Sequence, residues 1–281
     1  MPTEVIKIIT SLLDKALNVW NEKLAEVWSL LTTSPENFKG GAIWGIVQQI
    51  YGSIQGVGYS LLVIFFLAGV IKTTTSPQDL RRPETMFKLF LRFVIAKAVV
   101  TYGMDILMAV MEVPQGMVGG ILSTVGVGSA HEVQLPEAFA AAVEALKWRE
   151  SIPLVCLSLI CFVIIYALSF VLILTVYGRF FRFYMFAAIA PIPLAGLAGE
   201  GTNQMTRGFF RNYAAVCIEV VVIALACVIY SAIVGAPPVV DAESGAADIV
   251  TGYIVEVIFN MLVLVGTVKV CDRMAHELVG I

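Results

Sequence analysis

The sequence predicts an all-α, polytopic membrane protein with about five transmembrane helices, an N-terminal amphipathic helix and a proline-broken re-entrant or interfacial segment. Two observations predict this fold class. Of the 281 residues, 59% are apolar and only 14% are charged, whereas an average soluble domain is about 25% charged. Several stretches also reach the roughly 20 apolar residues that a bilayer-spanning helix needs, and short polar connections separate them.

Residues 1–42 are predicted to form an N-terminal amphipathic helix at the membrane interface. Between Val5 and Leu31 the apolar residues recur every three to four positions, which is the spacing of one helical face. The opposite face carries acids and lysines, and Trp20 and Trp28 are typical of the headgroup level. We expect this helix to lie in the interface or to pack against a partner subunit.

The transmembrane domain is expected to cover residues 43–281. Its spans are expected at 43–71, 89–111, 152–177, 213–235 and 249–271, with an external loop at 112–151. The first span repeats small residues every four positions, a pattern that lets a second helix approach closely. These helix-packing candidates are Gly52, Gly56 and Ser60.

Residues 185–198 are apolar, but the segment is too short and too broken for an ordinary span. Pro191 and Pro193 remove backbone donors and interrupt helical hydrogen bonding, so we expect a re-entrant or interfacial segment. A sixth span here would distribute the basic residues over both sides of the membrane, against the positive-inside rule. With five spans, most Lys and Arg share one side, and the acidic 236–248 connection lies on the other. The rule therefore predicts an outside N terminus and a cytoplasmic C terminus.

Signatures of catalysis and metal binding are missing from the sequence. It contains no G-x-x-x-x-G-K-[ST] loop, no G-x-S-x-G elbow and no H-E-x-x-H motif. The five cysteines lie in apolar stretches, and none belongs to a C-x-x-C pattern. We therefore expect a protein that is not an enzyme and that holds no cofactor and no metal.

Ionisable residues inside the predicted spans are the remaining candidates for function. Such groups are costly near mid-bilayer and face protein or water rather than lipid. Three interpretations stay open: ion pairs that hold helices together, the polar wall of a conduit, and a proton or ion relay. The conduit or helix-pairing candidates are Lys97, Asp105, Glu219 and Glu256. Lys97 and Asp105 share one helical face, which we expect to pack on the Glu219 or Glu256 helix or to face water.

Three short motifs in the second half of the chain resemble a known family. They are Gly178-Arg179-Phe180-Phe181-Arg182-Phe183-Tyr184, Ala190-Pro191-Ile192-Pro193-Leu194-Ala195 and Phe209-Phe210-Arg211-Asn212-Tyr213. Together they are similar to the central signature of TrbL-like conjugal transfer proteins, the polytopic inner-membrane channel subunits of type IV secretion systems. The chain looks closest to the branch found in integrative elements of Gram-positive bacteria, which residues 81–96 also fit.

The resemblance implies a non-enzymatic plasma-membrane subunit, surrounded by lipid, that helps form the translocation channel for single-stranded DNA and its bound protein. It also implies contacts with other secretion-system subunits, including the cytoplasmic ATPases, and a homo-oligomer, a pentamer by family analogy. By the same analogy, six arginines contact a partner ATPase or DNA phosphates, or else only anchor the topology. They are Arg81, Arg82, Arg179, Arg182, Arg207 and Arg211.

Two other functions remain open at this point. The proline-broken segment and the intramembrane charges motivate a small secondary transporter. The N-terminal amphipathic helix motivates a membrane scaffold that organises a larger assembly.

Overall fold

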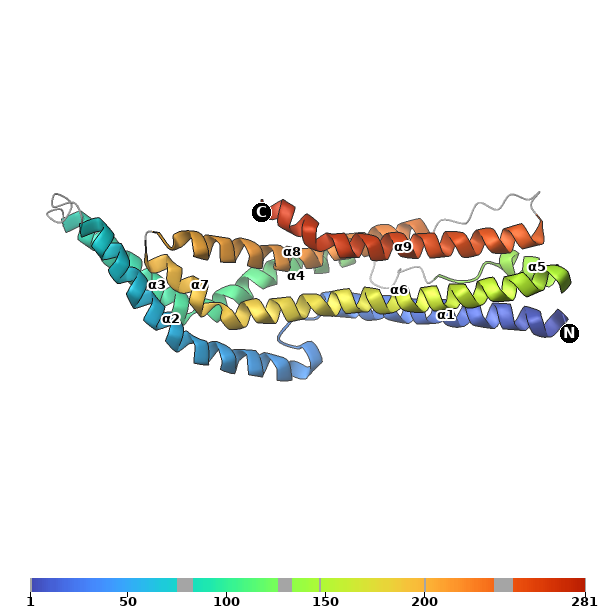
Figure 1. The fold of residues 1–281 in the computed structure, drawn as a ribbon, viewed down its shortest axis with the longest axis horizontal. Helices are drawn as coiled ribbons and strands as arrows, with labels where there is room; N and C mark the ends of the chain where they lie inside the picture. Colours follow the sequence, from blue (N-terminus) through green and yellow to red (C-terminus); the bar gives the residue numbers. More distant parts are fainter. Residues whose placement is uncertain are drawn as a thin grey trace. The chain divides into compact units, whose positions relative to one another are not determined.

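The structure, a computed structural model, describes residues 2–74, 83–125, 133–146, 148–199, 201–234 and 245–280. Within these residues the chain forms helices and no β-strand (Figure 1). In the same described ranges, five helices are long and apolar enough to cross a membrane: Phe38–Lys72, Gly103–Thr124, Ile152–Ile189, Asn203–Val234 and Ala246–Val279. The chain is therefore a multi-pass, all-α membrane protein, which confirms the predicted fold class.

The chain folds as two compact units, each built from separate stretches of sequence. The first unit comprises Met1–Thr32, Val118–Tyr177 and Val222–Cys271, and the second comprises Thr33–Met117, Gly178–Val221 and Asp272–Ile281. Four helices contribute residues to both units: α4 (Gly103–Val125), α6 (Trp148–Ile189), α8 (Asn203–Val234) and α9 (Ala246–Val279). The first unit also contains α1 (Pro2–Thr32) and α5 (Glu137–Glu144), and the second contains η1 (Phe38–Gly41), α2 (Ala42–Thr74), α3 (Pro83–Thr101), α7 (Pro191–Ala195) and η2 (Gly196–Ala198).

In the first unit, α1 buries its apolar face against the chain's own helices. Trp20 is fully buried, and its ring centroid lies 6.0 Å from that of Tyr230 on α8. The Asn21 amide donates to the Val133 carbonyl and accepts from the Val133 N–H, both at 3.1 Å. The same chain therefore covers most of this apolar face, and the expectation that α1 lies at the membrane interface stays a prediction.

In the second unit, a proline corner joins α6 to α8. α6 ends at Ile189, and α7 and η2 follow before α8 begins (Figure 1). Pro191 is buried and lies so close to α2 that a Cβ added to Gly58 would be 2.9 Å from the Pro191 carbonyl oxygen. The predicted segment 185–198 is thus shorter than expected, because its first five residues still belong to α6. It does not span, in agreement with the five-span interpretation.

Side chains donate hydrogen bonds to the backbone carbonyls of this corner. Thr206 donates to the Pro193 carbonyl oxygen at 2.6 Å. Arg92 on α3 donates from Nε to the carbonyl oxygen of Leu197 and from Nη2 to that of Gly199, both at 2.8 Å. An unsatisfied backbone group in hydrocarbon costs several kcal/mol, so these bonds allow the chain to turn here.

The second span differs from its prediction. Residues 89–111 do not form one continuous helix, because α3 and α4 meet at a bend at Tyr102, and the candidate span is Gly103–Thr124. The sequence favours a loop after residue 111 because Pro114 and several glycines follow, but membrane helices tolerate both residue types. The expected external loop 112–151 therefore begins as the second half of α4.

The last three spans are longer than predicted. The helix expected at 152–177 continues to Ile189, and the span expected at 213–235 begins at Asn203. The span expected at 249–271 continues to Val279. The sequence becomes less apolar near the arginines, so it predicts spans that are too short. A helix does not end where its side chains become charged.

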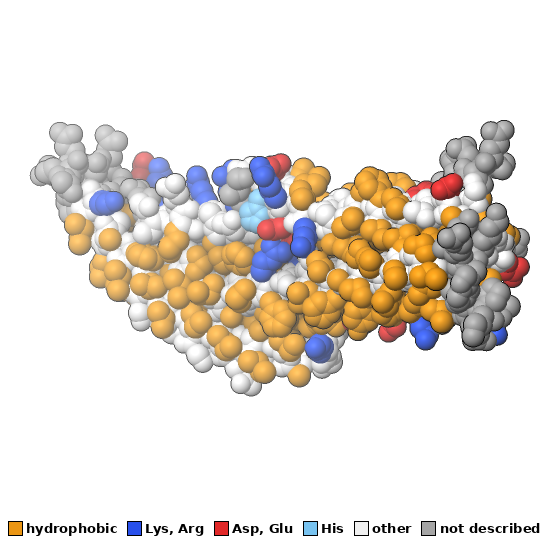
Figure 2. Space-filling view, turned by 45° about the vertical axis from the view of Figure 1, so that its right-hand side comes forward, with side chains coloured by type: hydrophobic (Ala, Val, Ile, Leu, Met, Phe, Trp, Pro, Cys, Tyr) orange, Lys and Arg blue, Asp and Glu red, His pale blue; other side chains and the backbone are white. Residues whose placement is uncertain are grey.

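Large apolar side chains remain exposed on the spanning helices, including Val63 on α2, Val163 on α6 and Phe259 on α9. Figure 2 shows apolar side chains over much of the face in view, with basic and acidic side chains gathered in small groups. Burial is uneven among the helices. In its most apolar window α8 is 61% buried, whereas the first span is 17% buried, so α8 is the most enclosed of the spanning helices.

Candidate functional site

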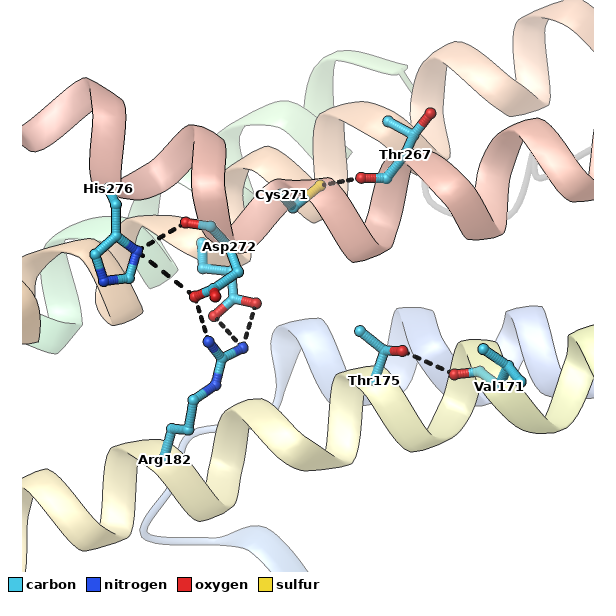
Figure 3. Close-up of polar contacts among 8 residues, drawn as sticks. Val171, Thr175, Arg182, Thr267, Cys271, Asp272 and His276 are labelled. Atoms are coloured by element: carbon cyan, nitrogen blue, oxygen red, sulfur yellow. Dashed lines mark hydrogen bonds and ion pairs between the residues drawn. The ribbon is translucent and has the colours of Figure 1, made fainter.

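Charged side chains from three helices of the second unit meet in one cluster (Figure 3). Arg182 on α6 donates from Nη2 to both carboxylate oxygens of Glu219 on α8, at 2.6 and 2.9 Å. Its Nη1 pairs with the carboxylate of Asp272 on α9. We call Arg179, Arg182, Glu219, Asp272 and His276 the charge cluster.

His276 adds a titratable ring to the α9 side of the charge cluster. Its Nδ1 lies 2.8 Å from the backbone carbonyl oxygen of Asp272 and 3.6 Å from the Asp272 carboxylate (Figure 3). The two residues are four positions apart and therefore neighbours on one helical face. The side chains of Asp272 and His276 are 44% and 31% exposed, whereas that of Glu219 is 1% exposed. The cluster thus runs from a buried carboxylate to a partly exposed edge.

Arg179 is the most buried cation of the charge cluster. It is 2% exposed, and its guanidinium carbon lies 4.8 Å from the centroid of the Phe180 ring. Its Nη1 has no hydrogen-bond partner among the described residues, and Glu219 attracts it electrostatically. A buried charge persists only with opposite charge beside it. Glu219 is therefore the counter-charge of two arginines, and the charge cluster holds α6, α8 and α9 together.

Of the four conduit or helix-pairing candidates, only Glu219 forms an ion pair in the part of the chain that the structure describes. Lys97, Asp105 and Glu256 are exposed, and no described residue pairs with them. The structure therefore does not bring Lys97 and Asp105 to the Glu219 helix.

The face of α3 that carries Lys97 contacts α2 instead. The Thr101 hydroxyl lies 3.0 Å from the Tyr59 hydroxyl. Gln55 donates to the backbone carbonyl oxygens of Val100 at 3.1 Å and Thr101 at 3.3 Å. Thr101 lies midway between Lys97 and Asp105 in sequence, so this contact involves the residue between them, while Lys97 itself stays exposed.

The six arginines predicted to contact partners or anchor the topology fall into three groups. Arg179 and Arg182 turn inward to the charge cluster, so burial removes Arg179 from any surface of the chain. Arg207 and Arg211 are exposed on α8. Arg81 and Arg82 lie outside the described residues.

The small-residue stripe of the first span packs on no helix in the described part of the chain. A Cβ added to Gly52 or Gly56 would meet nothing within 4 Å, and Ser60 is exposed. The close approach occurs at Gly58, on a different face of α2, where Pro191 lies. Within the described chain the close approach is therefore at Gly58, and packing of another helix on Gly52, Gly56 and Ser60 stays a prediction.

Sequence reasoning did not identify three residues of these arrangements: Asp272, His276 and Arg92. Asp272 and His276 follow the predicted end of the last span at residue 271, so they counted as part of a polar tail. Their four-residue spacing is the signal that one helical face carries both. Arg92 lies within the span predicted at 89–111 and was not among the candidates, because its backbone acceptors lie more than one hundred positions away.

Comparison with protein families gives one finding. A family model described as TrbL/VirB6 plasmid conjugal transfer like protein matches residues 20–191. This range covers more than half of the chain and includes the charge-cluster arginines and Pro191. Comparison with curated proteins finds no significant match.

Proposed function

Because the chain belongs to the family of TrbL/VirB6 plasmid conjugal transfer like proteins, we propose that it helps form the translocation channel for single-stranded DNA and protein across the plasma membrane. As a member of this family it is a component of conjugal transfer, that is, of a type IV secretion system, and it associates with other subunits of that system. The observation that carries the proposal is the family match over residues 20–191 together with five helices able to span a membrane.

Exposed charged side chains on the membrane helices support a conduit. Asp105 and Glu256 lie in candidate spans, and neither pairs with another described residue. Ionisable groups inside a membrane face protein or water rather than lipid. A subunit that surrounds an aqueous path with further copies of itself gives these side chains such surroundings.

The proposal includes orientation and partners. The basic residues gather on one side of five spans, which favours an outside N terminus and a cytoplasmic C terminus. On the cytoplasmic side the subunit contacts the ATPases of the system, with exposed Arg207 and Arg211 as candidate contacts. The protein has no catalytic step of its own; it supplies the path, and the ATPases supply the work.

The transporter alternative loses one of the two features that motivated it, the proline-broken segment. Transporters use broken helices because the freed carbonyls bind ions. Here Thr206 and Arg92 occupy the carbonyls of Pro193, Leu197 and Gly199. The carbonyls of the corner are therefore bonded to side chains of the protein, as expected for a structural turn.

The test is a clean deletion of the coding sequence from a conjugative donor, with the wild-type chain supplied in trans as the control. We expect transfer frequency to fall by several orders of magnitude, donor growth to stay normal, and the wild-type copy to restore transfer. Transfer at normal frequency from the deletion strain would overturn the proposal.

A second pair of variants separates a conduit from a scaffold. Lys97→Ala and Asp105→Ala remove exposed charges, so assembly into the secretion system is expected to persist. A conduit then loses transfer with assembly intact, whereas a scaffold keeps both. Co-purification of the variant with the other subunits is the assembly readout.

A further inference from the structure

The bend between α3 and α4 interrupts a helix that the local sequence would continue. The region contains no proline, and its one glycine, Gly103, is of a residue type that membrane helices tolerate. The apolar pattern accordingly predicts one helix through residues 89–111. In the structure α3 ends at Thr101 and α4 begins at Gly103. The cause of the bend is therefore tertiary.

Helical hydrogen bonding stops for three residues at the bend. The Tyr102 N–H still donates to the Ala98 carbonyl oxygen at 2.9 Å, and the Ile106 N–H donates to that of Tyr102 at 3.0 Å. Between them, and all within the described residues, the helical bonds from the N–H groups of residues 103–105 to the carbonyls of residues 99–101 are missing, so Tyr102 is not helical. The end of α3 thus leaves carbonyls open, and the start of α4 leaves N–H groups open.

Side chains of α2 occupy these open groups. The Tyr51 hydroxyl donates to the Val100 carbonyl oxygen at 2.9 Å. Gln55 donates to the carbonyl oxygens of Val100 at 3.1 Å and Thr101 at 3.3 Å. The backbone N–H of Met104 lies within hydrogen-bonding reach of the Tyr51 oxygen. Tyr51 therefore stands between a carbonyl and an N–H that would bond each other in a continuous helix, and a side chain inserted in this way kinks a helix.

Gly103 makes room for the inserted hydroxyl. A Cβ added to Gly103 would lie 2.5 Å from the Tyr51 oxygen and 2.6 Å from Cδ1 of Leu194 on α7. Tyr51 and Leu194 are both buried, and close packing leaves such side chains little room to move aside. The glycine is therefore matched to the bent form, whereas a continuous helix needs no glycine at this position.

The bend differs from a proline kink in being reversible. A proline lacks the N–H in every conformation, so the helical bond is lost permanently. Here every donor and acceptor of the continuous helix is present in the backbone, because residues 98–106 contain no proline. The bent form thus depends on two side chains of α2, Tyr51 and Gln55, that take the place of the helical partners.

We propose that this bend is a conformational hinge, latched by Tyr51, with a continuous helix through residues 89–111 as its second state. The two states satisfy the same backbone groups with different partners. In the latched state the partners are Tyr51 and Gln55. In the continuous state the carbonyls and N–H groups of residues 99–105 bond one another, and Tyr51 withdraws. Packed helices change between discrete arrangements of this kind. The hinge belongs to the second unit alone and goes beyond the proposed channel function.

The experiment measures the distance across the hinge in the full-length protein in lipid nanodiscs. Spin labels are attached to Phe90→Cys on α3 and Val113→Cys on α4, both exposed positions, on a background lacking the five native cysteines. Tyr51→Phe removes the hydroxyl of the latch and keeps the ring. Tyr59→Phe is the matched control on the same helix, because the Tyr59 hydroxyl lies 3.0 Å from the Thr101 hydroxyl and outside the helical ladder.

The readout is the distance distribution from pulsed electron spin resonance. In a continuous helix the two labelled positions lie about 35 Å apart, and the bend brings them closer. We expect one short distance in the background protein and in Tyr59→Phe, and a population at the longer distance in Tyr51→Phe. An unchanged distribution in Tyr51→Phe would overturn the proposal, because the bend would then not depend on the hydroxyl.

Met104→Pro provides a second arm. The change removes the N–H that a continuous helix needs, and proline is tolerated in the first turn of a helix, where position 104 lies in α4. Combined with Tyr51→Phe, it is expected to return the labels to the short distance. A long distance in the double variant would also overturn the proposal, because the lengthening would then not come from closure of the helix.

The hinge and the proposed channel function fail separately. The spin-label distances are measured on the protein alone, whereas the channel function is tested by transfer from a deletion strain. If the distances do not change, the channel proposal stands. If the deletion strain transfers normally, the hinge stands.

Discussion

Arg182 shows how one side chain determines the packing of three helices. Its guanidinium binds Glu219 through Nη2 and Asp272 through Nη1. The planar guanidinium has separate donor groups for the two carboxylates, a geometry that a lysine ammonium does not reproduce. The sequence gives Glu219 as a candidate for helix pairing or for a conduit wall within the membrane, but it cannot predict the partner. Which face of α6 turns toward α8 depends on packing along both helices.

Loss of the Glu219 carboxylate is expected to destabilise the protein strongly. Glu219→Ala leaves the buried Arg179 without its nearby carboxylate and leaves Arg182 with Asp272 alone, and an uncompensated buried charge costs about 3–5 kcal/mol. Thermal unfolding of the detergent-solubilised protein is expected to show a clear fall in Tm.

Glu277→Ala is the matched control, since Glu277 pairs with Arg273 on the exposed surface of α9, where ion pairs contribute little. If the Tm of Glu219→Ala equals that of Glu277→Ala, the charge cluster does not hold the helices together.

At the scale of elements, the contact between α2 and the proline corner depends on one glycine. The sequence predicts a small-residue stripe on α2 because spacing is visible in a single chain. It does not predict that Pro191 packs against a different face of α2, at Gly58, because that contact joins segments 133 positions apart. Similarly, the role of Arg92 as a hydrogen-bond donor to the corner follows from the tertiary structure alone.

Gly58→Ala is expected to destabilise the second unit. The added Cβ would lie 2.9 Å from both the Cβ and the carbonyl oxygen of Pro191, so backbone must move, and overpacking of this kind costs about 1–3 kcal/mol. The measurement is the resistance of the purified protein to unfolding by denaturing detergent.

Gly52→Ala is the control on the same helix, because its Cβ meets nothing within 4 Å and its fold stability should stay near wild type. Equal stability of the two variants would mean that α2 and α7 are not in close contact.

At the scale of the whole molecule, composition alone predicts most of the architecture. Low charge content and five apolar stretches are enough to predict a multi-pass helical protein, because the bilayer permits few alternatives. The division into two units of interleaved segments was not predicted. It arises from contacts among residues distant in sequence, such as Asn21 with Val133 and Arg92 with Gly199, which no local pattern encodes.

The proposed orientation is testable with single cysteines on a background lacking the native ones. The chosen positions are Ser76, Thr202, Ser244 and Gly280, of which Ser76 and Ser244 lie outside the described residues. Because the basic residues favour the cytoplasm, an impermeant thiol reagent added to intact cells is expected to label Ser244→Cys alone. Labelling at Thr202→Cys with protection at Ser244→Cys would reverse the orientation of the last two spans and contradict the five-span topology.

The length of α6 has a consequence for the bilayer around it. A helix of 42 residues is about 63 Å long, roughly twice the hydrocarbon thickness of about 30 Å. Tilting alone would require roughly 60° from the bilayer normal, beyond the range of about 0–40° seen for membrane helices. Hydrophobic mismatch on this scale means that part of α6 extends past the lipid tails, although its exposed side chains remain apolar as far as Ile189. We therefore expect neighbouring protein to shield that extension of α6 from water.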